Sequence, residues 1–97
     1  MAYEKRTMPP KELEAFLNEP YIGVIATMDD ENRPRLAPIW YQWENGAAHM
    51  FTFRNSLKWR NLEKRPYASL CIDHRQLPYA MVAIDGVIEE TDRSVYD

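Results

Sequence analysis

The chain has 97 residues, of which 45% are hydrophobic and 28% charged, and this composition is typical of one small globular domain with a modest core. Its net charge of −3 argues against general nucleic-acid binding, which usually requires a strongly basic domain. No apolar run approaches the ~20 residues of a membrane span, the charged opening does not resemble a signal peptide, and a single cysteine excludes an internal disulfide. We therefore expect a cytoplasmic protein with no membrane partner and no nucleic-acid partner.

The N-terminal part of the chain predicts a helix and two strands. Residues 11–17 follow two prolines and carry apolar side chains at i, i+3 and i+4, as expected for a short amphipathic helix. The apolar run 21–28 predicts a buried strand, and the polar residues after it favour a turn. Residues 33–43 predict a long second strand, which Pro34 and Pro38 should bend or confine to a sheet edge.

The rest of the chain predicts three more strands and a second short helix. Asn45-Gly46 is the strongest hairpin signal, and it should lead into a third strand over 47–54. Further strands are expected over 67–73 and 79–90, separated by a polar break. Five strands with hairpin-length connections favour a single mainly β domain over residues 1–97, with an antiparallel sheet that curls into a barrel. Because such a sheet leaves an edge uncovered, we expect either further C-terminal sequence or a partner chain.

Residues 54–65 form a cationic segment within this acidic chain. The segment carries a local charge of +4, because Glu63 is its only acidic residue and its basic residues are Arg54, Lys58, Arg60, Lys64 and Arg65. Asn55 and Ser56 are both favoured N-cap residues, so the second helix should begin there. The concentration of positive charge at a helix start suggests an anion site.

A single phosphate group suits this helix start better than a polyanion does, because the expected site is compact. A helix N-terminus leaves about four backbone N–H groups without partners and carries roughly half a positive charge. Thr52 and Arg54 alternate with two phenylalanines on the preceding strand, so they project from the opposite face to these aromatic rings. Together with Ser56 and Lys58 they form a candidate phosphate cradle, although a solvated helix end would also explain the pattern.

Other polar residues have simpler explanations. Lys64 and Arg65 fall at the C-terminus of the helix, where the dipole favours cations without any ligand. His49 and His74 lie far apart and neither has a second ligand at a recognised spacing, so we predict no metal site. Cys71 lies in an apolar run and is expected to be a buried core thiol rather than a nucleophile.

Short motifs follow one another along most of the chain, from about Leu17 to Glu89. They are Ile25-Ala26-Thr27-Met28-Asp29, Arg33-Pro34, Ala37-Pro38-Ile39-Trp40-Tyr41, Phe51-Thr52, Ser56-x-Lys58-x-x-Asn61-Leu62, Pro66-x-Ala68-Ser69-Leu70, Pro78-Tyr79 and Ile84-Asp85-Gly86. In this order they resemble the pyridoxamine 5′-phosphate oxidase-like proteins of the FMN-binding split-barrel superfamily. No single motif is specific, whereas the ordered series is.

The resemblance implies a homodimer of split β-barrels with two flavin-type cofactors in clefts at the dimer interface. In such proteins the strand-to-helix segment holds the cofactor phosphate, and the second strand lines the isoalloxazine ring. Carried over to this sequence, the phosphate role falls on Thr52, Arg54, Ser56 and Lys58, with Asn61 on the following turn, and the ring role on Pro38, Ile39 and Trp40. The implied cofactor is FMN, with the deazaflavin coenzyme F-420 as the alternative, because residues 66–86 look more like the deazaflavin subgroup. Family members usually run some tens of residues further, through a helix and a closing strand that this chain lacks.

The activity implied by the resemblance is an oxidoreductase that transfers hydride to or from a small-molecule substrate. The chemistry would belong to the cofactor, because no side chain of the sequence is an obvious acid, base or nucleophile, and we name no catalytic residue. Trp40, Tyr41 and Trp43 can stack on a ring or a substrate, or simply pack in the core or a dimer contact. One alternative is a non-catalytic flavin- or haem-binding protein that acts as a carrier or sensor. Another is a small barrel that binds single-stranded nucleic acid through Arg54, Arg60 and aromatic side chains.

Overall fold

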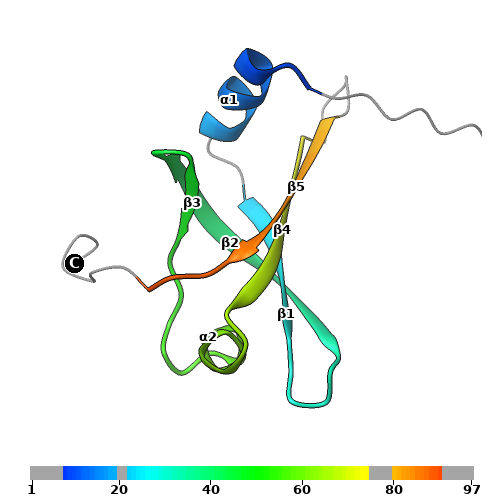
Figure 1. The fold of residues 1–97 in the computed structure, drawn as a ribbon, viewed down its shortest axis with the longest axis vertical. Coiled ribbons are helices and arrows are strands. Elements are labelled where there is room, and N and C mark those ends of the chain that lie inside the picture. Colours follow the sequence, from blue (N-terminus) through cyan, green and yellow to red (C-terminus); the bar gives the residue numbers. More distant parts are fainter. Residues whose placement is uncertain (1–7, 20–21, 75–79, 91–97) are drawn as a thin grey trace, which may run out of the picture.

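Five antiparallel strands and two short helices make up the computed structural model, which describes residues 8–19, 22–74 and 80–90 (Figure 1). In chain order they are α1 (Pro10–Asn18), β1 (Ile22–Met28), β2 (Pro34–Glu44), β3 (Ala47–Met50), α2 (Leu57–Lys64), β4 (Tyr67–His74) and β5 (Ala80–Val87). The strand order is β3-β2-β1-β4-β5, and every pairing is antiparallel. The sheet curls into a half-barrel, which confirms the predicted mainly β architecture. Tyr21, Tyr79 and the polar break after His74 lie outside the described residues.

The hydrophobic core lies on the face of the sheet that α1 and α2 cover, which we call the inner face. Inward-pointing Ile25, Ile39 and Ile72 are at most 6% exposed, and residues of both helices complete the cluster. The whole buried set is Phe16, Leu17, Ile25, Ile39, Tyr41, Leu62, Leu70 and Ile72. The Tyr41 hydroxyl donates to the Leu17 carbonyl oxygen over 3.2 Å, which joins β2 to the end of α1. Tyr41 is therefore a core residue, and its hydroxyl also ties β2 to α1.

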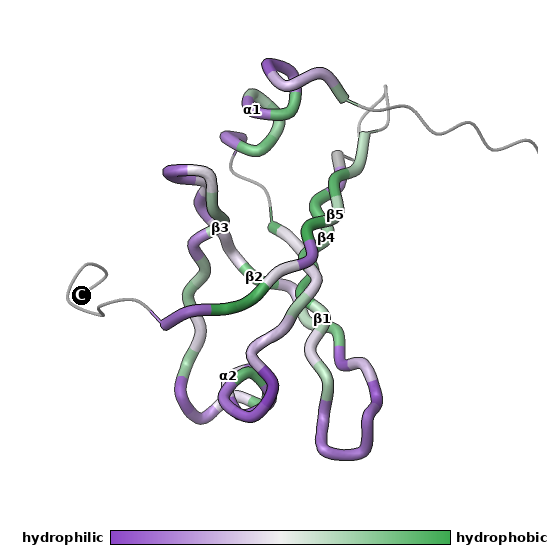
Figure 2. Tube along the Cα trace, viewed as in Figure 1, coloured by the Kyte–Doolittle hydropathy of each residue, from purple (hydrophilic) through white to green (hydrophobic). Residues whose placement is uncertain are grey.

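The opposite face of the sheet, which we call the outer apolar face, is not covered by any described element. Antiparallel register brings Ile22 opposite Trp40 and Tyr67 opposite Val87 on this face. Its exposed large hydrophobic residues are Ile22, Val24, Met28, Leu36, Trp40, Tyr67, Met81 and Val87. Trp40 is 67% exposed. Figure 2 shows hydrophobic stretches in β1, β4 and β5 and hydrophilic residues in much of α2 and in the β1–β2 turn. Soluble proteins rarely expose a contiguous apolar surface of this kind unless another surface packs on it.

Cys71 also lies on the outer apolar face, so the prediction of a buried core thiol is wrong. The residue pairs with Val24 of β1 and Ala83 of β5, and its side chain is only partly buried. Its neighbours along the chain, Leu70 and Ile72, point inward and are buried. Because all three residues are apolar, the sequence lacks the alternation that would have shown which face Cys71 occupies.

The third strand is shorter than predicted, since β3 ends at Met50 and not at residue 54. Its pairing with β2 runs from Glu44 opposite Ala47 to Tyr41 opposite Met50. Continued in the same register, the ladder would bring Phe53 opposite Pro38, which has no N–H to donate. The chain instead leaves the sheet and turns, with the Ser56 N–H bonded to the Phe53 carbonyl oxygen over 3.1 Å.

Residues 34–40 of β2 have β1 as their only neighbour among the described strands, because β3 pairs only with residues 41–44. Pro34 and Pro38 both lie in this half of β2, so the prediction that they mark a sheet edge is confirmed for that part of the strand. The backbone of β2 is therefore open on one side from Pro34 to Trp40.

The two tight turns follow from local sequence. Asn45 and Gly46 have φ angles of 53° and 73°, as a two-residue hairpin of the primed type requires. In the β1–β2 turn, Asp29 Oδ1 accepts the N–H groups of Glu31 and Arg33 over 2.8 and 2.9 Å, and its Oδ2 accepts Arg35 Nε over 2.8 Å. These bonds, foremost the one from the Arg33 N–H, lower the pKa of Asp29 from its ordinary 3.8 to about 2, although burial opposes them.

We expect Asp29 to make folding stability depend on pH below about 4. Because its pKa is lower in the folded state, the unfolded chain binds more protons in this range, and stability falls as the pH drops from about 4 towards 2. Urea unfolding at pH 6 and pH 3 should show a smaller pH-dependent loss for Asp29→Asn than for the wild type. Glu63→Gln, at an exposed position of α2, should keep the full loss. Equal losses in the wild type and Asp29→Asn would contradict the assignment.

Candidate functional site

The start of α2 presents hydroxyl and backbone N–H groups together. Ser56 is the N-cap, as predicted, and its Oγ accepts the Trp59 N–H over 3.2 Å and donates to the Phe53 carbonyl oxygen over 2.7 Å. Thr52 Oγ1 lies 3.1 Å from Ser56 Oγ. The N–H groups of Leu57 and Lys58 have no hydrogen-bond partner within the described part of the chain. The helix start can therefore offer two N–H groups to an anion, because the Ser56 hydroxyl already donates to Phe53 and the Thr52 hydroxyl is held against Ser56 Oγ.

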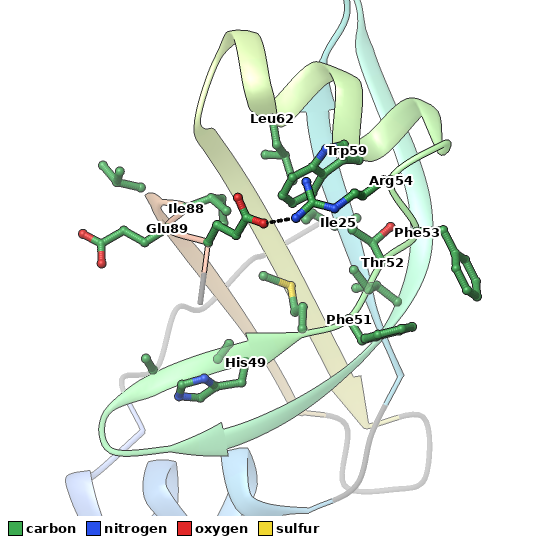
Figure 3. Close-up of a pocket in the computed structure, with 16 residues that line it drawn as sticks. Ile25, His49, Phe51, Thr52, Phe53, Arg54, Trp59, Leu62, Ile88 and Glu89 are labelled. Carbon is green, nitrogen blue, oxygen red and sulfur yellow. Dashed lines mark hydrogen bonds and ion pairs between the residues drawn. The ribbon is translucent and has the colours of Figure 1, made fainter. Parts of the chain in front are cut away.

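Arg54 lies beside this helix start and reaches over a cavity (Figure 3). Its guanidinium carbon is 5.0 Å from the centroid of the Trp59 ring, a distance at which cation–π attraction operates. Its NH2 group forms an ion pair with Glu90, which lies beyond the end of β5, and both side chains are about half exposed. Arg54 is thus held between a helix on one side and the chain after β5 on the other.

The cavity has a volume of about 450 Å³ and is mainly apolar. Ile25, Ile39 and Leu62 of the core line it, together with residues of β3 and the chain that follows β3. The chain after β5 forms another part of the wall through Ile88 and Glu90. Thr52 and Arg54 also line the cavity, so polar groups from one short segment meet an otherwise hydrophobic space. This combination is typical of a small-molecule site.

The structure brings some of the predicted cofactor residues together and separates others. Thr52, Arg54 and Ile39 line the cavity, and Ser56 and Lys58 lie at the adjoining start of α2. Pro38 and Trp40, by contrast, point to the outer apolar face, because successive residues of a strand alternate between faces. The three side chains that were predicted to line the ring, Pro38, Ile39 and Trp40, therefore cannot all meet one ligand, whereas the open backbone edge of this stretch can.

Asn61 lies apart from the predicted phosphate cradle. It is 3% exposed, and its Nδ2 donates to Thr27 Oγ1 over 3.1 Å, which joins α2 to β1 in the core. This bond positions the helix, and through it the residues at the helix start.

At the other end of α2, Lys64 and Arg65 both form ion pairs with Asp30 over 2.8 Å, an arrangement that needs no ligand. The hydrogen bonds from Lys64 and Arg65 lower the pKa of the Asp30 carboxyl, and the one from Lys64 has the larger effect.

Several residues at the site were not selected from the sequence. Trp59, Met50 and His49 line the cavity, and the His49 Nε2 lies 3.2 Å from the Glu44 carbonyl oxygen. Trp59 stands in the first turn of a helix whose start was predicted, but its contact with Arg54, which precedes the helix, could not be derived from helix geometry. Nor could the contact of Glu90, because it is 36 residues from Arg54 and no local pattern relates the two.

Trp43 has a structural role in the described fold. Its ring packs against the hydrophobic core, and its Nε1 donates to Glu14 Oε1 of α1 over 3.2 Å.

Neither helix within the described ranges is long and apolar enough to cross a membrane. Among the described residues no group of three His, Cys, Asp or Glu side chains could hold a metal ion.

Comparison with known proteins identifies the family. The model of the family described as pyridoxamine 5′-phosphate oxidase matches residues 9–96. A pyridoxine/pyridoxamine 5′-phosphate oxidase of Anaplasma phagocytophilum (strain HZ) is 32% identical over 82 residues, which are 84% of this chain and 39% of that protein. This chain therefore spans less than half the length of that relative.

Solved structures share the fold. An F420 reductase superposes with a TM-score of 0.75 at 22% identity, over 79% of this chain and 61% of that one. A haem-binding protein from Mycobacterium smegmatis superposes with a TM-score of 0.73 at 24% identity, over 90% of this chain and 39% of that one. These similarities establish the split-barrel fold. Together with the family match over nearly the whole chain, they show that the chain belongs to the pyridoxamine 5′-phosphate oxidase-like family of split-barrel proteins.

Proposed function

We propose that this protein binds a flavin-type cofactor and uses it as an oxidoreductase of a small-molecule substrate. FMN is the first candidate for the cofactor and the deazaflavin F-420 the second. The observation that carries the proposal is the cluster of Thr52, Arg54, Ser56 and Lys58 at the start of α2, beside a cavity that Ile39 of β2 also lines. Family membership supports the same function.

The residues present fit a phosphate-bearing, partly aromatic ligand. Arg54 and Lys58 supply positive charge, the two N–H groups at the start of α2 supply hydrogen bonds, and the adjoining cavity of about 450 Å³ lies within the usual size range of ligand pockets. Bound there, a flavin would supply hydride transfer at its ring. The chain itself would hold the phosphate at α2, present the open backbone edge of β2 to the ring, and exclude water with its apolar cavity wall.

A homodimer is part of the proposal, because the family resemblance implies that the cofactor cleft lies at a dimer interface. The outer apolar face supports a second copy of this chain as the partner, because removing apolar surface of this kind from water lowers the free energy. Trp40 and Pro38 lie on that face, next to the open edge of β2. Dimerisation through it would therefore bring a second subunit close to the proposed ring position. We further propose that the protein acts in the cytoplasm.

A haem-binding protein without turnover is the second candidate. It is favoured by His49, a half-buried imidazole that lines the apolar cavity, because histidine is a common axial ligand of haem iron. The likeness to the mycobacterial haem-binding protein points the same way. In this case the cavity would hold the porphyrin and Arg54 would face a propionate group.

Cofactor identification tests both candidates. We expect the purified full chain, incubated with FMN, F-420 or haem and then desalted, to retain FMN, as shown by its visible absorbance and by mass spectrometry of the released cofactor. His49→Ala should retain FMN equally well, whereas it should lose haem if haem is the true ligand. Retention of haem alone would favour the second candidate, and retention of none of the three would contradict both. Turnover of the reduced cofactor with candidate acceptors would then separate an enzyme from a carrier.

A further inference from the structure

The anion site at α2 contains an internal carboxylate. Glu90 forms an ion pair with Arg54, the residue that combines positive charge, a place in the cavity wall and proximity to the helix start. A dashed line in Figure 3 marks this ion pair at the Arg54 guanidinium group. The stretch that carries it is anchored at Ile88, whose N–H donates to the Pro66 carbonyl oxygen over 2.8 Å. An acidic side chain thus occupies the position at which an anionic ligand would meet Arg54.

We propose that Glu90 is a built-in competitor for the ligand's phosphate, so that binding of the anion at Arg54 and displacement of the Glu90 side chain are coupled. This inference rests on the proposed phosphate site. A carboxylate and a phosphate both bind the same edge of a guanidinium group by paired, charge-assisted hydrogen bonds. The Arg54 guanidinium carbon lies over the Trp59 ring, 5.0 Å from its centroid, and Arg54 Nη2 meets Glu90 Oε1. Glu90 and a phosphate oxygen at this position therefore compete for the Nη2 donor of Arg54.

The geometry also gives the competition a structural consequence. Ile88, Glu89 and Glu90 line the same cavity as Thr52 and Arg54, so a ligand that displaces the carboxylate also changes the cavity wall. This coupling is reciprocal. The contact between Glu90 and Arg54 lowers the affinity for the anion, and the bound anion weakens that contact by the same factor. Because the ion pair is about half exposed, the factor should be small, roughly two- to fivefold in affinity.

Glu89 provides a matched control for removal of the competing charge. It is adjacent to Glu90 and lines the same cavity, but it forms no ion pair with any described residue. Glu89→Gln and Glu90→Gln therefore change the net charge equally, and only the second releases Arg54. Affinity for FMN and for inorganic phosphate would be measured by titration calorimetry on the full chain, for the wild type, both single variants and the same variants in an Arg54→Gln background.

We expect Glu90→Gln to tighten both ligands roughly two- to fivefold beyond any effect of Glu89→Gln, and to have no such effect once Arg54 is replaced. In NMR spectra of the wild type, added phosphate should shift the amide resonances of Ile88 and Glu90 as well as those of Leu57 and Lys58. In Glu90→Gln it should shift only the amide resonances at the helix start. Equal affinities of Glu90→Gln and Glu89→Gln, or an effect that survives in Arg54→Gln, would overturn the competition but leave the phosphate site standing. If neither ligand binds the wild type or Glu90→Gln, the phosphate site fails and the competition fails with it.

Discussion

Replacing either Arg54 or Lys58 with alanine should weaken FMN binding roughly 10- to 100-fold without unfolding the protein. A hydrogen bond to a charged group contributes about 1.5–3 kcal/mol, and each 1.4 kcal/mol corresponds to a factor of ten in affinity. Arg54 is about half exposed and Lys58 is only partly buried, so neither substitution leaves a cavity in the core. The dissociation constant from titration of FMN fluorescence, together with the midpoint of thermal unfolding, measures both parts of the prediction.

Arg60→Ala is the control for this experiment. Arg60 lies on α2 with Lys58 and carries the same charge as Arg54, but its N–H already bonds the Ser56 carbonyl oxygen, its side chain is exposed, and it has no ion-pair partner within the described part of the chain. Arg60→Ala should change the affinity for FMN far less than Arg54→Ala or Lys58→Ala does. If FMN binds Arg54→Ala and Lys58→Ala as tightly as the wild type, the phosphate cannot lie at the start of α2.

A charge on the outer apolar face should dissociate the proposed homodimer. Trp40 is 67% exposed and lies opposite Ile22 in the register of β1 and β2, among the exposed hydrophobic residues of four strands. Trp40→Glu would bury an unpaired carboxylate in the interface, which costs about 3 kcal/mol or more and should raise the dimer dissociation constant at least about 100-fold. Sedimentation velocity over a range of concentrations would show a shift from dimer to monomer.

The dimer prediction has a control and a second readout. Ala15→Glu introduces the same charge at an exposed position of α1, away from the outer apolar face, and should leave the dimer intact. Because the cofactor cleft is proposed at the interface, Trp40→Glu should also weaken FMN binding, with the loss diminishing at high protein concentration. A wild type that sediments as a monomer at every concentration would refute the homodimer, and a Trp40→Glu variant that remains dimeric would place the interface elsewhere.

Much of the local structure could be predicted because it depends on residues a few positions apart. Ser56 is the N-cap of α2 because its hydroxyl reaches the N–H three residues on, and Asn45-Gly46 turns the chain because both adopt positive φ. Motifs in sequence order also led to the family, and the match over residues 9–96 confirms that interpretation. The cofactor, the homodimer and the roles of the site residues stay predictions.

The start of α2 and the concentration of cations around it were determined by the sequence alone, since capping and charge operate within a turn or two of helix. The contacts of the site were decided by the tertiary structure. The strand pairings ended β3 at Met50, decided which face of β2 is covered, and left Cys71 on the outer apolar face. Packing of α2 on β1 took Asn61 into the core to bond Thr27, and the path of β5 brought Glu90 to Arg54 across 36 residues. Contacts between residues so far apart in the chain depend on how the whole sheet curls, and no local pattern of residues encodes that.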